Sequence, residues 1–342
     1  NACICVLDDP EATLSDLMQH VTGPDFPTKG IIMGRAGIRA AYATGRGKIV
    51  LRARTEFEDF GKDRVRIIVT ELPYQVNKRM LIKSMADQVN DKKLEGISDI
   101  RDETDRTGMR IVIELKRDVN SAVVLNYLYK HTQMQESFGA IMLALVDGEP
   151  KVLSLHQMLY HYLEHQKDVI VRRTRYDLDK AEARAHILEG LLIALDNIDE
   201  IVRIIRNSPN TAEAKTQLME RFALSDKQAQ AILDMRLARL TGLERERLQE
   251  EYAELEKTIA YLRAVLADEK MVLGIIREEI LAIKAKYADE RRTQISLMDG
   301  EIDPEDLIQE DSVVVTLTHF GYVKRIPRAT YRSQNRGGKG IM

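Results

Sequence analysis

The first 150 residues mix two patterns of hydrophobic and polar positions. Strict alternation predicts strands that bury one face, and apolar residues three and four apart predict helices. The predicted strands span residues 47–59, 63–73, 97–104 and 108–118, and the predicted helices span 77–96, with Asn77 as N-cap, and 121–132. This order of elements predicts an α+β domain over residues 1–153 with a mostly antiparallel sheet.

Beyond residue 150 the pattern becomes that of long helices. Residues 151–208 contain no proline and keep helical spacing for about fifty residues, which is far longer than a helix of an ordinary globular domain. Apolar residues alternate at spacings of three and four over residues 248–287, with one skipped position at Glu269. A 3.5-residue repeat predicts a coiled-coil seam, so residues 154–207 and 247–292 are predicted to pair as antiparallel helices.

The residues between these helices, 208–246, predict a knob of short helices. Pro209 ends the incoming helix, Thr211 and Ser225 are candidate N-caps, and Gly242 marks the turn into the returning helix. The knob has more apolar residues than a two-helix tip can bury, which indicates self-association, with a well-packed tip as the alternative. The candidate contact residues are Ile232, Leu233, Met235, Leu237 and Leu240.

The last fifty residues change character again. Residues 293–311 include the acidic run DGEIDPEDLIQED and are predicted to form a linker. Residues 312–332 predict two strands around a Phe-Gly turn, followed by a glycine-rich basic loop. Because a lone hairpin is not independently stable, residues 312–342 are predicted to begin a further all-β domain. The chain also starts at Asn1, so we expect a piece of a longer polypeptide.

Charge is segregated along the chain, although the formal net charge is only −3. Two stretches, residues 29–54 and 324–339, hold basic residues and no acidic ones. Cations gathered in this way suit contact with a polyanion, whereas the alternative is chance clustering on solvated faces. The basic residues are Lys29, Arg35, Arg39, Arg46, Lys48, Arg52 and Arg54 in the first stretch, and Lys324, Arg325, Arg328, Arg332, Arg336 and Lys339 in the second.

Composition excludes several classes of protein. The sequence has no run of 18 apolar residues and no basic-then-apolar leader, so we expect no membrane association and a cytoplasmic location. Cys3 and Cys5 are too close together to close a useful disulfide loop, and are predicted to be buried small side chains.

Three candidate chemical sites are disfavoured by the residues or the helix around them. The terminal GGKG lacks the four-residue spacer, the Ser or Thr and the helix of a phosphate-binding loop. His161 and His165 are one helical turn apart, but no Glu follows the first, so a solvated helix face is favoured over a metal site. Tyr176 follows a group of arginines in RRTRYDLD (172–179) and so resembles a DNA-cleaving nucleophile, yet its place in the long helix favours packing against the partner helix.

Six longer stretches carry a family resemblance. They are GPDFPTKGII (23–32), AYATGRGKIVLRAR (41–54), ELPYQVNK (71–78), EGISDIRDETDRTGMRIVIELKRD (95–118), QAQAILDMRLARLTGLE (228–244) and QNRGGKG (334–340). Together they resemble the A subunits of DNA gyrase, a family of type IIA DNA topoisomerases. The resemblance implies a tower domain over 1–153, a coiled coil, a dimeric exit gate over 208–246 and the first strands of a DNA-wrapping β-pinwheel over 312–342.

The resemblance also implies roles for individual residues. DNA contacts are implied for Lys29, Arg35, Arg46, Lys48, Arg52, Arg54 and Lys78. The wrapping box is implied for Gln334, Asn335, Arg336, Gly337, Gly338, Lys339 and Gly340, where Asn335 replaces the family's arginine. The family's catalytic tyrosine precedes the tower domain, so no residue of this chain is expected to cleave DNA.

Partners and cofactors follow from the same resemblance. It implies double-stranded DNA as a partner, a homodimer through the exit gate, and a B subunit that binds Mg²⁺ and ATP in an A2B2 enzyme. This chain itself is expected to bind no cofactor or metal. Two alternatives stay open: the A subunit of topoisomerase IV, which tends to lack a clean wrapping box, and a non-enzymatic coiled-coil scaffold, which leaves the basic stretches without a role.

Overall fold

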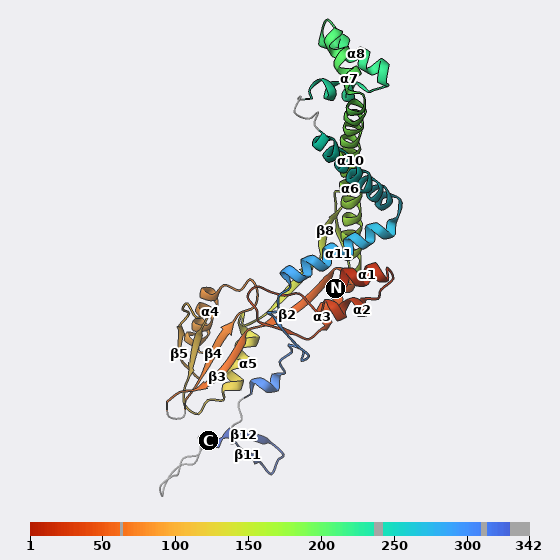
Figure 1. Cartoon of the computed structure of the whole chain (residues 1–342). Coiled ribbons are helices and arrows are strands. Elements are labelled where there is room, and N and C mark those ends of the chain that lie inside the picture. Colours follow the sequence, from red (N-terminus) through yellow and green to blue (C-terminus); the bar gives the residue numbers. More distant parts are fainter. Residues whose placement is uncertain (62–63, 236–241, 309–312, 329–342) are drawn as a thin grey trace. The chain divides into compact units, whose positions relative to one another are not determined.

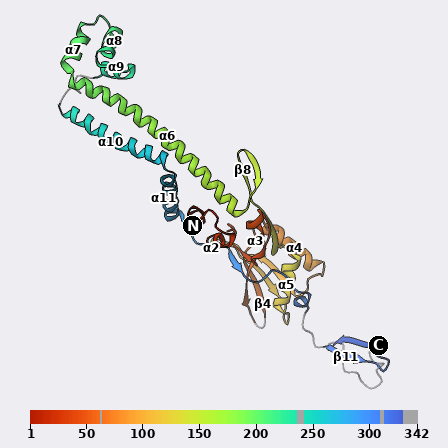
Figure 2. The same ribbon diagram turned by 90° about the vertical axis from the view of Figure 1, so that its right-hand side faces the viewer.

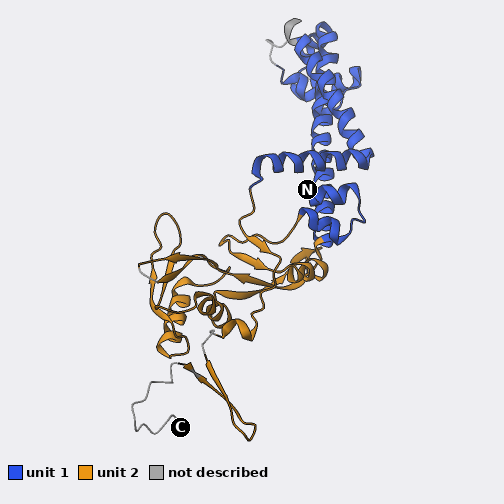
Figure 3. Cartoon of the chain, turned by 90° about the horizontal axis from the view of Figure 1, so that it is seen from below, with its two compact units in different colours: residues 1–20, 156–289 blue, residues 21–155, 290–342 orange. Residues whose placement is uncertain are grey.

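The chain divides into two compact units. The computed structural model describes residues 1–342 except 62–63, 236–241, 309–312 and 329–342 (Figure 1). A helical unit contains residues 1–20 and 156–289, and a sheet unit contains residues 21–155 and 290–342 (Figure 3). The mixture of helices and antiparallel sheets confirms the predicted α+β class. The first twenty residues, predicted to belong to the α+β domain, pack with the helices instead.

One sheet of the sheet unit has the strand order β10-β1-β2-β7. Its strands are β1 (Ile31–Met33), β2 (Arg46–Arg52), β7 (Gln135–Ile141) and β10 (Gln294–Ser296). Neighbouring strands are antiparallel except β1 and β10, which run parallel. Helix α3 (Ala36–Thr44) connects β1 to β2 and packs on β2.

A second sheet has the order β3-β4-β6-β5 and is antiparallel throughout. Its strands are β3 (Arg54–Asp59), β4 (Val65–Glu71), β5 (Ile97–Asp102) and β6 (Ile111–Leu115), and its helices are α4 (Lys78–Asn90) and α5 (Ser121–His131). The core of the unit includes Ile67, Leu81, Ile113 and Leu128, all fully buried. Asn77 caps α4 as predicted, since its side chain accepts a hydrogen bond from the Met80 N–H at 3.1 Å.

The single strand predicted over residues 47–59 is wrong, because the chain changes sheets at Ala53. Ala53 is fully buried and its N–H donates to the Met134 carbonyl at 2.7 Å. β2 therefore ends in one sheet and β3 begins in the other. The alternation of side chains continues through this point, so it contains no sign of the change.

Two hairpins complete the strands of this unit. In one, β8 (Leu143–Val146) pairs with β9 (Glu149–Val152) across Asp147 and Gly148, which both have positive φ. In the other, β11 (Val313–Leu317) pairs with β12 (Val323–Pro327), which confirms the predicted hairpin near the C-terminus.

The linker prediction is wrong over residues 293–308, because this acidic segment folds onto the sheet unit. β10 adds a strand beside β1, and the Thr293 side chain is fully buried. Asp25 accepts a hydrogen bond from the Thr293 N–H at 2.8 Å, and Ile302 packs against the core of the unit. The short 3-10 helix η2 (Pro304–Leu307) then lies against α5.

The helical unit is built on α6 and α10, which pair as the predicted antiparallel helices (Figure 2). α6 (Leu155–Asp196) has 42 residues and α10 is Gly242–Ala267. Ala181, Ala185 and Ile259 are buried between them. Ion pairs of 2.7 Å for Arg184–Glu251 and 2.6 Å for Arg263–Glu182 flank this seam, and their order along the two helices fits antiparallel pairing.

The returning helix is interrupted, beside the position where the repeat skips. Asp268 accepts a hydrogen bond from the Lys270 N–H at 2.9 Å and caps a separate helix, α11 (Glu269–Tyr287). α11 takes a different direction from α10 (Figure 2) and packs against α1 (Ala2–Asp8), which α2 (Leu14–His20) follows. The seam predicted to Tyr287 is therefore wrong at its end: Ile283 is 55% and Tyr287 is 66% exposed.

The tip consists of α7 (Ile198–Asn207), α8 (Thr211–Phe222) and α9 (Asp226–Leu233). Ser225 caps α9 with a full capping box, as predicted, but Asn210 rather than Thr211 caps α8. Ile232 is buried in the chain's own cluster, and Leu233 and Met235 are half-buried against it. Leu237 and Leu240 lie outside the described residues.

Two further predictions for single residues are wrong. Tyr176 is 66% exposed, because the contact face of α6 runs through Ile170, Thr174 and Ala181, and a residue two positions past Thr174 lies roughly 200° around the helix. Cys3 and Cys5 lie in α1, but both are half-buried rather than buried. None of the helices that the structure describes is both long enough and apolar enough to traverse a bilayer.

Candidate DNA-binding surface

The candidate surface is built where α3 rests directly on the backbone of β2. A methyl group on Gly37 would lie 2.0 Å from the Lys48 carbonyl oxygen, and one on Gly47 would lie 2.4 Å from the Gly37 carbonyl oxygen. Gly45 closes α3 with a left-handed φ of 78° and turns the chain into β2. The glycines of this stretch therefore allow a contact between helix and strand that side chains would prevent.

Four basic side chains belong to the elements of this contact: Arg35, the N-cap residue of α3, Arg39 on α3, and Arg46 and Lys48 on β2. We call them the cation cluster. All four are exposed, and among the described residues none of the four side chains makes an ion pair or a hydrogen bond. Arg35 and Arg39 are one helical turn apart, and Arg46 and Lys48 share the face of β2 that is opposite to Gly47, which meets α3. The four charges are thus available to an external anion.

Three other predicted cations are engaged within the sheet unit. Arg52 is half-buried, donates to the Gln135 side chain at 2.6 Å and lies 4.5 Å from the Tyr129 ring centroid. Burial lowers the pKa of the Arg52 guanidinium. Arg54 pairs with Glu71 at 3.5 Å.

Lys78, at the start of α4, is the third engaged cation. It pairs with Asp102 at 2.8 Å, and its hydrogen bond lowers the pKa of that carboxyl group. Lys29 is exposed, and its side chain has no partner among the described residues. Like the cation cluster, it is therefore available to an external anion. The structure therefore divides the predicted set into available cations and cations that stabilise the fold.

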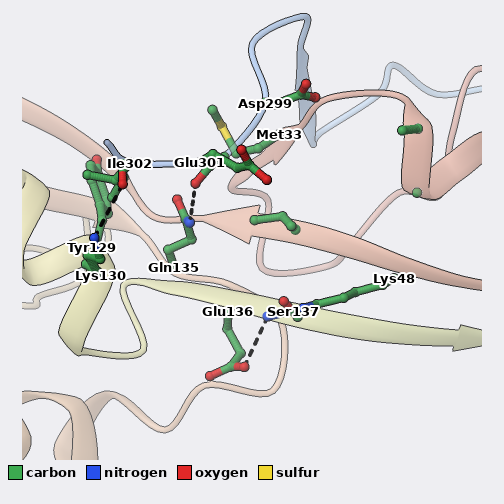
Figure 4. A pocket seen from close by; sticks show the side chains of 14 residues that line it. Met33, Lys48, Tyr129, Lys130, Gln135, Glu136, Ser137, Asp299, Glu301 and Ile302 are labelled. Carbon is green, nitrogen blue, oxygen red and sulfur yellow. Dashed lines mark hydrogen bonds between the residues drawn. The ribbon is translucent and has the colours of Figure 1, made fainter. Parts of the chain in front are cut away.

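A polar cleft of about 540 Å³ adjoins Lys48 (Figure 4). Val50 and Ser137 from the sheet line this cleft, and so does the segment 299–302. Gln135 donates to the Gly300 carbonyl at 2.7 Å, which holds this segment in place. Asp299 and Glu301 line the cleft and contribute negative charge. The acidic segment therefore limits how far a polyanion can extend from Lys48 in this direction.

The sequence prediction missed this acidic boundary. Residues 299–302 follow Lys48 by about 250 positions, and the run was interpreted as a linker. Only the pairing of β10 with β1 brings it beside the cations. A parallel partner for β1 gives no local signal in either stretch.

The second basic stretch is described only in part. Lys324 and Arg325 are exposed on β12, and Arg328 follows them. Arg332 and the whole predicted wrapping box, residues 334–340, lie outside the described residues. His161 and His165 lie on α6, and the described residues contain no group of three or more metal-type ligands.

Comparison with known proteins covers nearly the whole chain. The family model for the A subunit of DNA gyrase and topoisomerase IV matches residues 1–281, and the model for the DNA gyrase C-terminal domain, a β-propeller, matches residues 312–342. The chain is 61% identical over 336 residues to the DNA gyrase A subunit of Clostridium acetobutylicum, covering 98% of this chain and 40% of that protein.

Two further relatives have the same name. Identity is 60% over 334 residues with the protein of Halalkalibacterium halodurans, covering 97% of this chain and 40% of the relative. It is 53% over 343 residues with that of Staphylococcus aureus, covering 100% of this chain and 39% of the relative. The chain thus spans about two fifths of the length of these relatives. It belongs to the family of DNA gyrase and topoisomerase IV A subunits.

Proposed function

We propose that this chain is the DNA-flanking and gate-forming part of a DNA gyrase A subunit. The intact enzyme would be a type IIA topoisomerase that introduces negative supercoils into DNA with ATP hydrolysis. Family membership supports the class of enzyme. The single observation that carries the role of this chain is the cation cluster, four exposed basic side chains on α3, its N-cap and β2 that make no ion pair with any described residue.

The cluster suits duplex DNA for a simple electrostatic reason. Each basic side chain that neutralises a phosphate releases a condensed counterion, and the gain in entropy favours binding at low salt. Arg35, Arg39, Arg46 and Lys48 have no internal acidic partner among the described residues, so binding DNA breaks no ion pair. Arg52, Arg54 and Lys78 would instead hold the surface in shape.

The other roles of the chain are proposed on the family resemblance. Leu233 and Met235, with Leu237 and Leu240, would contact a second copy at the exit gate. Ile232 is buried within the chain, so we leave it out of this contact. Residues 334–340 would begin DNA wrapping, with Arg336 and Lys339 at phosphates.

Catalysis and cofactor binding are assigned to parts outside this chain. The tyrosine that cleaves DNA would precede the tower domain in the intact protein, and the B subunit would bind Mg²⁺ and ATP. Residues 1–342 alone are therefore expected to bind DNA without cleaving it.

The A subunit of topoisomerase IV is the main alternative within the family. The three relatives described above are all named as gyrase subunits, which favours gyrase. Supercoiling of relaxed plasmid by the intact enzyme would distinguish gyrase from a decatenating topoisomerase IV.

The experiment that tests the role of this chain is a salt series of duplex binding. The double variant Arg46→Ala/Lys48→Ala removes two proposed phosphate contacts, so the slope of log K against log salt should become shallower by about 1.8. A matched control, Arg175→Ala/Lys180→Ala, removes two exposed charges from α6 and should leave the slope unchanged. Equal slopes for all three proteins, or no binding of the unmodified chain at low salt, would favour the coiled-coil scaffold.

A further inference from the structure

Three large apolar side chains stand exposed in one row beside the cation cluster. Ile141 and Leu143 are each 58% exposed, and Leu145 is 74% exposed. We call them the apolar stripe. Exposed and half-buried residues alternate without interruption from Ser137 to Leu145, so the three share one face of the extended chain. Leaving three adjacent aliphatic side chains in water is unfavourable and marks a contact surface.

The register of the sheet fixes the stripe next to the cations. Ile141 lies directly opposite Arg46, and Gly139 lies directly opposite Lys48. Residues that face each other across antiparallel strands point to the same side of the sheet. Apart from its own chain neighbours, no described residue has an atom within 4 Å of where a side chain on Gly139 would begin, so the face beside Lys48 is open. Charged and apolar contacts thus continue along one surface.

The hairpin that carries the stripe is anchored at the cation cluster. The Met142 N–H donates to the Gly45 carbonyl at 2.8 Å, and Gly45 is the residue that ends α3. The Leu153 N–H in turn donates to the Met142 carbonyl at 2.9 Å. Beyond this anchor, β8 and β9 project from the sheet as a two-stranded ribbon (Figure 2). The stripe is therefore held in a fixed relation to Arg46.

We propose that the apolar stripe packs against the sugar edges of the same DNA duplex whose phosphates the cation cluster contacts. This proposal rests on the proposed function. Between the phosphates, the walls of the minor groove present the carbon–hydrogen edges of deoxyribose, and proteins that bind this groove insert apolar side chains such as Ile and Leu into it. The cations would fix the position of the duplex, and the stripe would add favourable release of water from apolar surface.

A second copy of the chain fits this surface less well. Two identical surfaces that meet around a twofold axis would bring Arg46 and Lys48 of one copy close to the same residues of the other. None of these side chains has an acidic partner among the described residues, so like charges would repel across the contact. DNA instead provides negatively charged phosphates that can lie against Arg46 and Lys48.

The test separates apolar contact from phosphate contact in duplex binding by this chain. Leu143→Ser/Leu145→Ser should weaken binding roughly tenfold, because two exposed aliphatic side chains no longer lose water on binding. The slope of log K against log salt should stay unchanged, because no phosphate contact is removed. The heat-capacity change of binding, measured by titration calorimetry, should become less negative.

Two controls complete the design. Leu281→Ser/Ile283→Ser removes a similar exposed pair, at 44% and 55%, from α11 and should bind DNA like the unmodified chain. Ile141→Ser should weaken DNA binding by itself, and it should weaken binding further when combined with Leu143→Ser/Leu145→Ser. Circular dichroism of each variant checks the fold.

Several results would overturn the proposal. They are unchanged affinity and heat capacity in the stripe variants, a loss of affinity that comes with a shallower salt slope, or a loss of self-association in sedimentation, which would identify a second copy as the partner. If the unmodified chain fails to bind DNA at low salt, the proposed function is refuted together with this proposal. If the unmodified chain binds DNA and the stripe variants bind equally well, only this proposal is refuted.

Discussion

Gly37 determines how closely α3 can approach β2, and Gly37→Ala is expected to force the two apart. The added methyl group would lie 2.0 Å from the Lys48 carbonyl oxygen and 2.8 Å from its carbonyl carbon. Both are backbone atoms in the middle of a sheet, so neither can rotate away. Gly37 does not have a positive φ, so alanine meets no backbone strain and the effect is purely steric.

The magnitude follows from the size of the overlap. A comfortable separation for such atoms is roughly 3.5 Å, so the helix must retreat by more than about 1 Å. Overpacking costs roughly 1–3 kcal/mol, and backbone atoms place this case near 3 kcal/mol. Alanine regains at most about 1 kcal/mol of helix propensity, which leaves a local loss of about 2 kcal/mol.

Hydrogen exchange over peptides that cover residues 36–52 measures this local stability. A loss of about 2 kcal/mol corresponds to roughly 30-fold faster exchange of the β2 amides. DNA affinity should fall too, because Arg35 and Arg39 move with the helix away from Arg46 and Lys48. The matched control is Gly139→Ala on the neighbouring strand, where, apart from the chain neighbours, the new methyl group meets no atom of a described residue within 4 Å.

Two outcomes would refute this reasoning. One is exchange in Gly37→Ala that matches the unmodified chain. The other is an equal effect of Gly37→Ala and Gly139→Ala, which would mean that loss of glycine flexibility rather than the close contact is responsible.

Three further predictions address single side chains. Asn210→Ala should cost about 1 kcal/mol in the unfolding free energy of the tip, measured by urea denaturation, while Thr211→Ala should cost much less, because only Asn210 caps α8. Burial raises the pKa of Asp25, but hydrogen bonds from Thr293 and Arg292 outweigh it, so the pKa is lowered in the folded chain. A lowered pKa means that the stabilisation is present above the unfolded pKa and is lost as pH falls through the folded pKa. Asp25→Asn should therefore lower stability at neutral pH and flatten the acid limb of a pH–stability profile, and an unchanged profile would contradict it. Tyr176→Phe should leave DNA binding unchanged, and a covalent-adduct assay should find no DNA attached to the unmodified chain; adducts that disappear in the variant would show that Tyr176 is a nucleophile after all.

Local patterns were sufficient for α4, α5, α6 and α10, for the hairpin of β11 and β12, and for the caps at Asn77 and Ser225. The helical repeat of α6 and α10 arises because one face of each helix packs against the other helix. The apolar residues of that face recur three and four positions apart, so the repeat can be recognised within each helix's own sequence. The caps at Asn77 and Ser225 were predictable because a cap acts on amides two or three residues away. The cations at Arg35, Arg46 and Lys48 were identified for the same reason, since their clustering is visible along the chain.

Two predictions failed because the decisive partner is distant in sequence. Residues 293–308 were predicted to be a linker because nothing near them indicates the parallel pairing of β10 with β1. The change of sheet at Ala53 is invisible because alternation of side chains is the same in both sheets.

The sequence by itself therefore determined the family, the class of fold and the concentration of positive charge. Only the tertiary structure decided which cations are free. Arg54 and Lys78 find their acids, Glu71 and Asp102, across strand and helix contacts, whereas Arg46 and Lys48 find none among the described residues. An ion pair depends on distances of a few ångströms in space, and the pairing of strands sets those distances. The spacing of residues along the chain does not reveal that pairing.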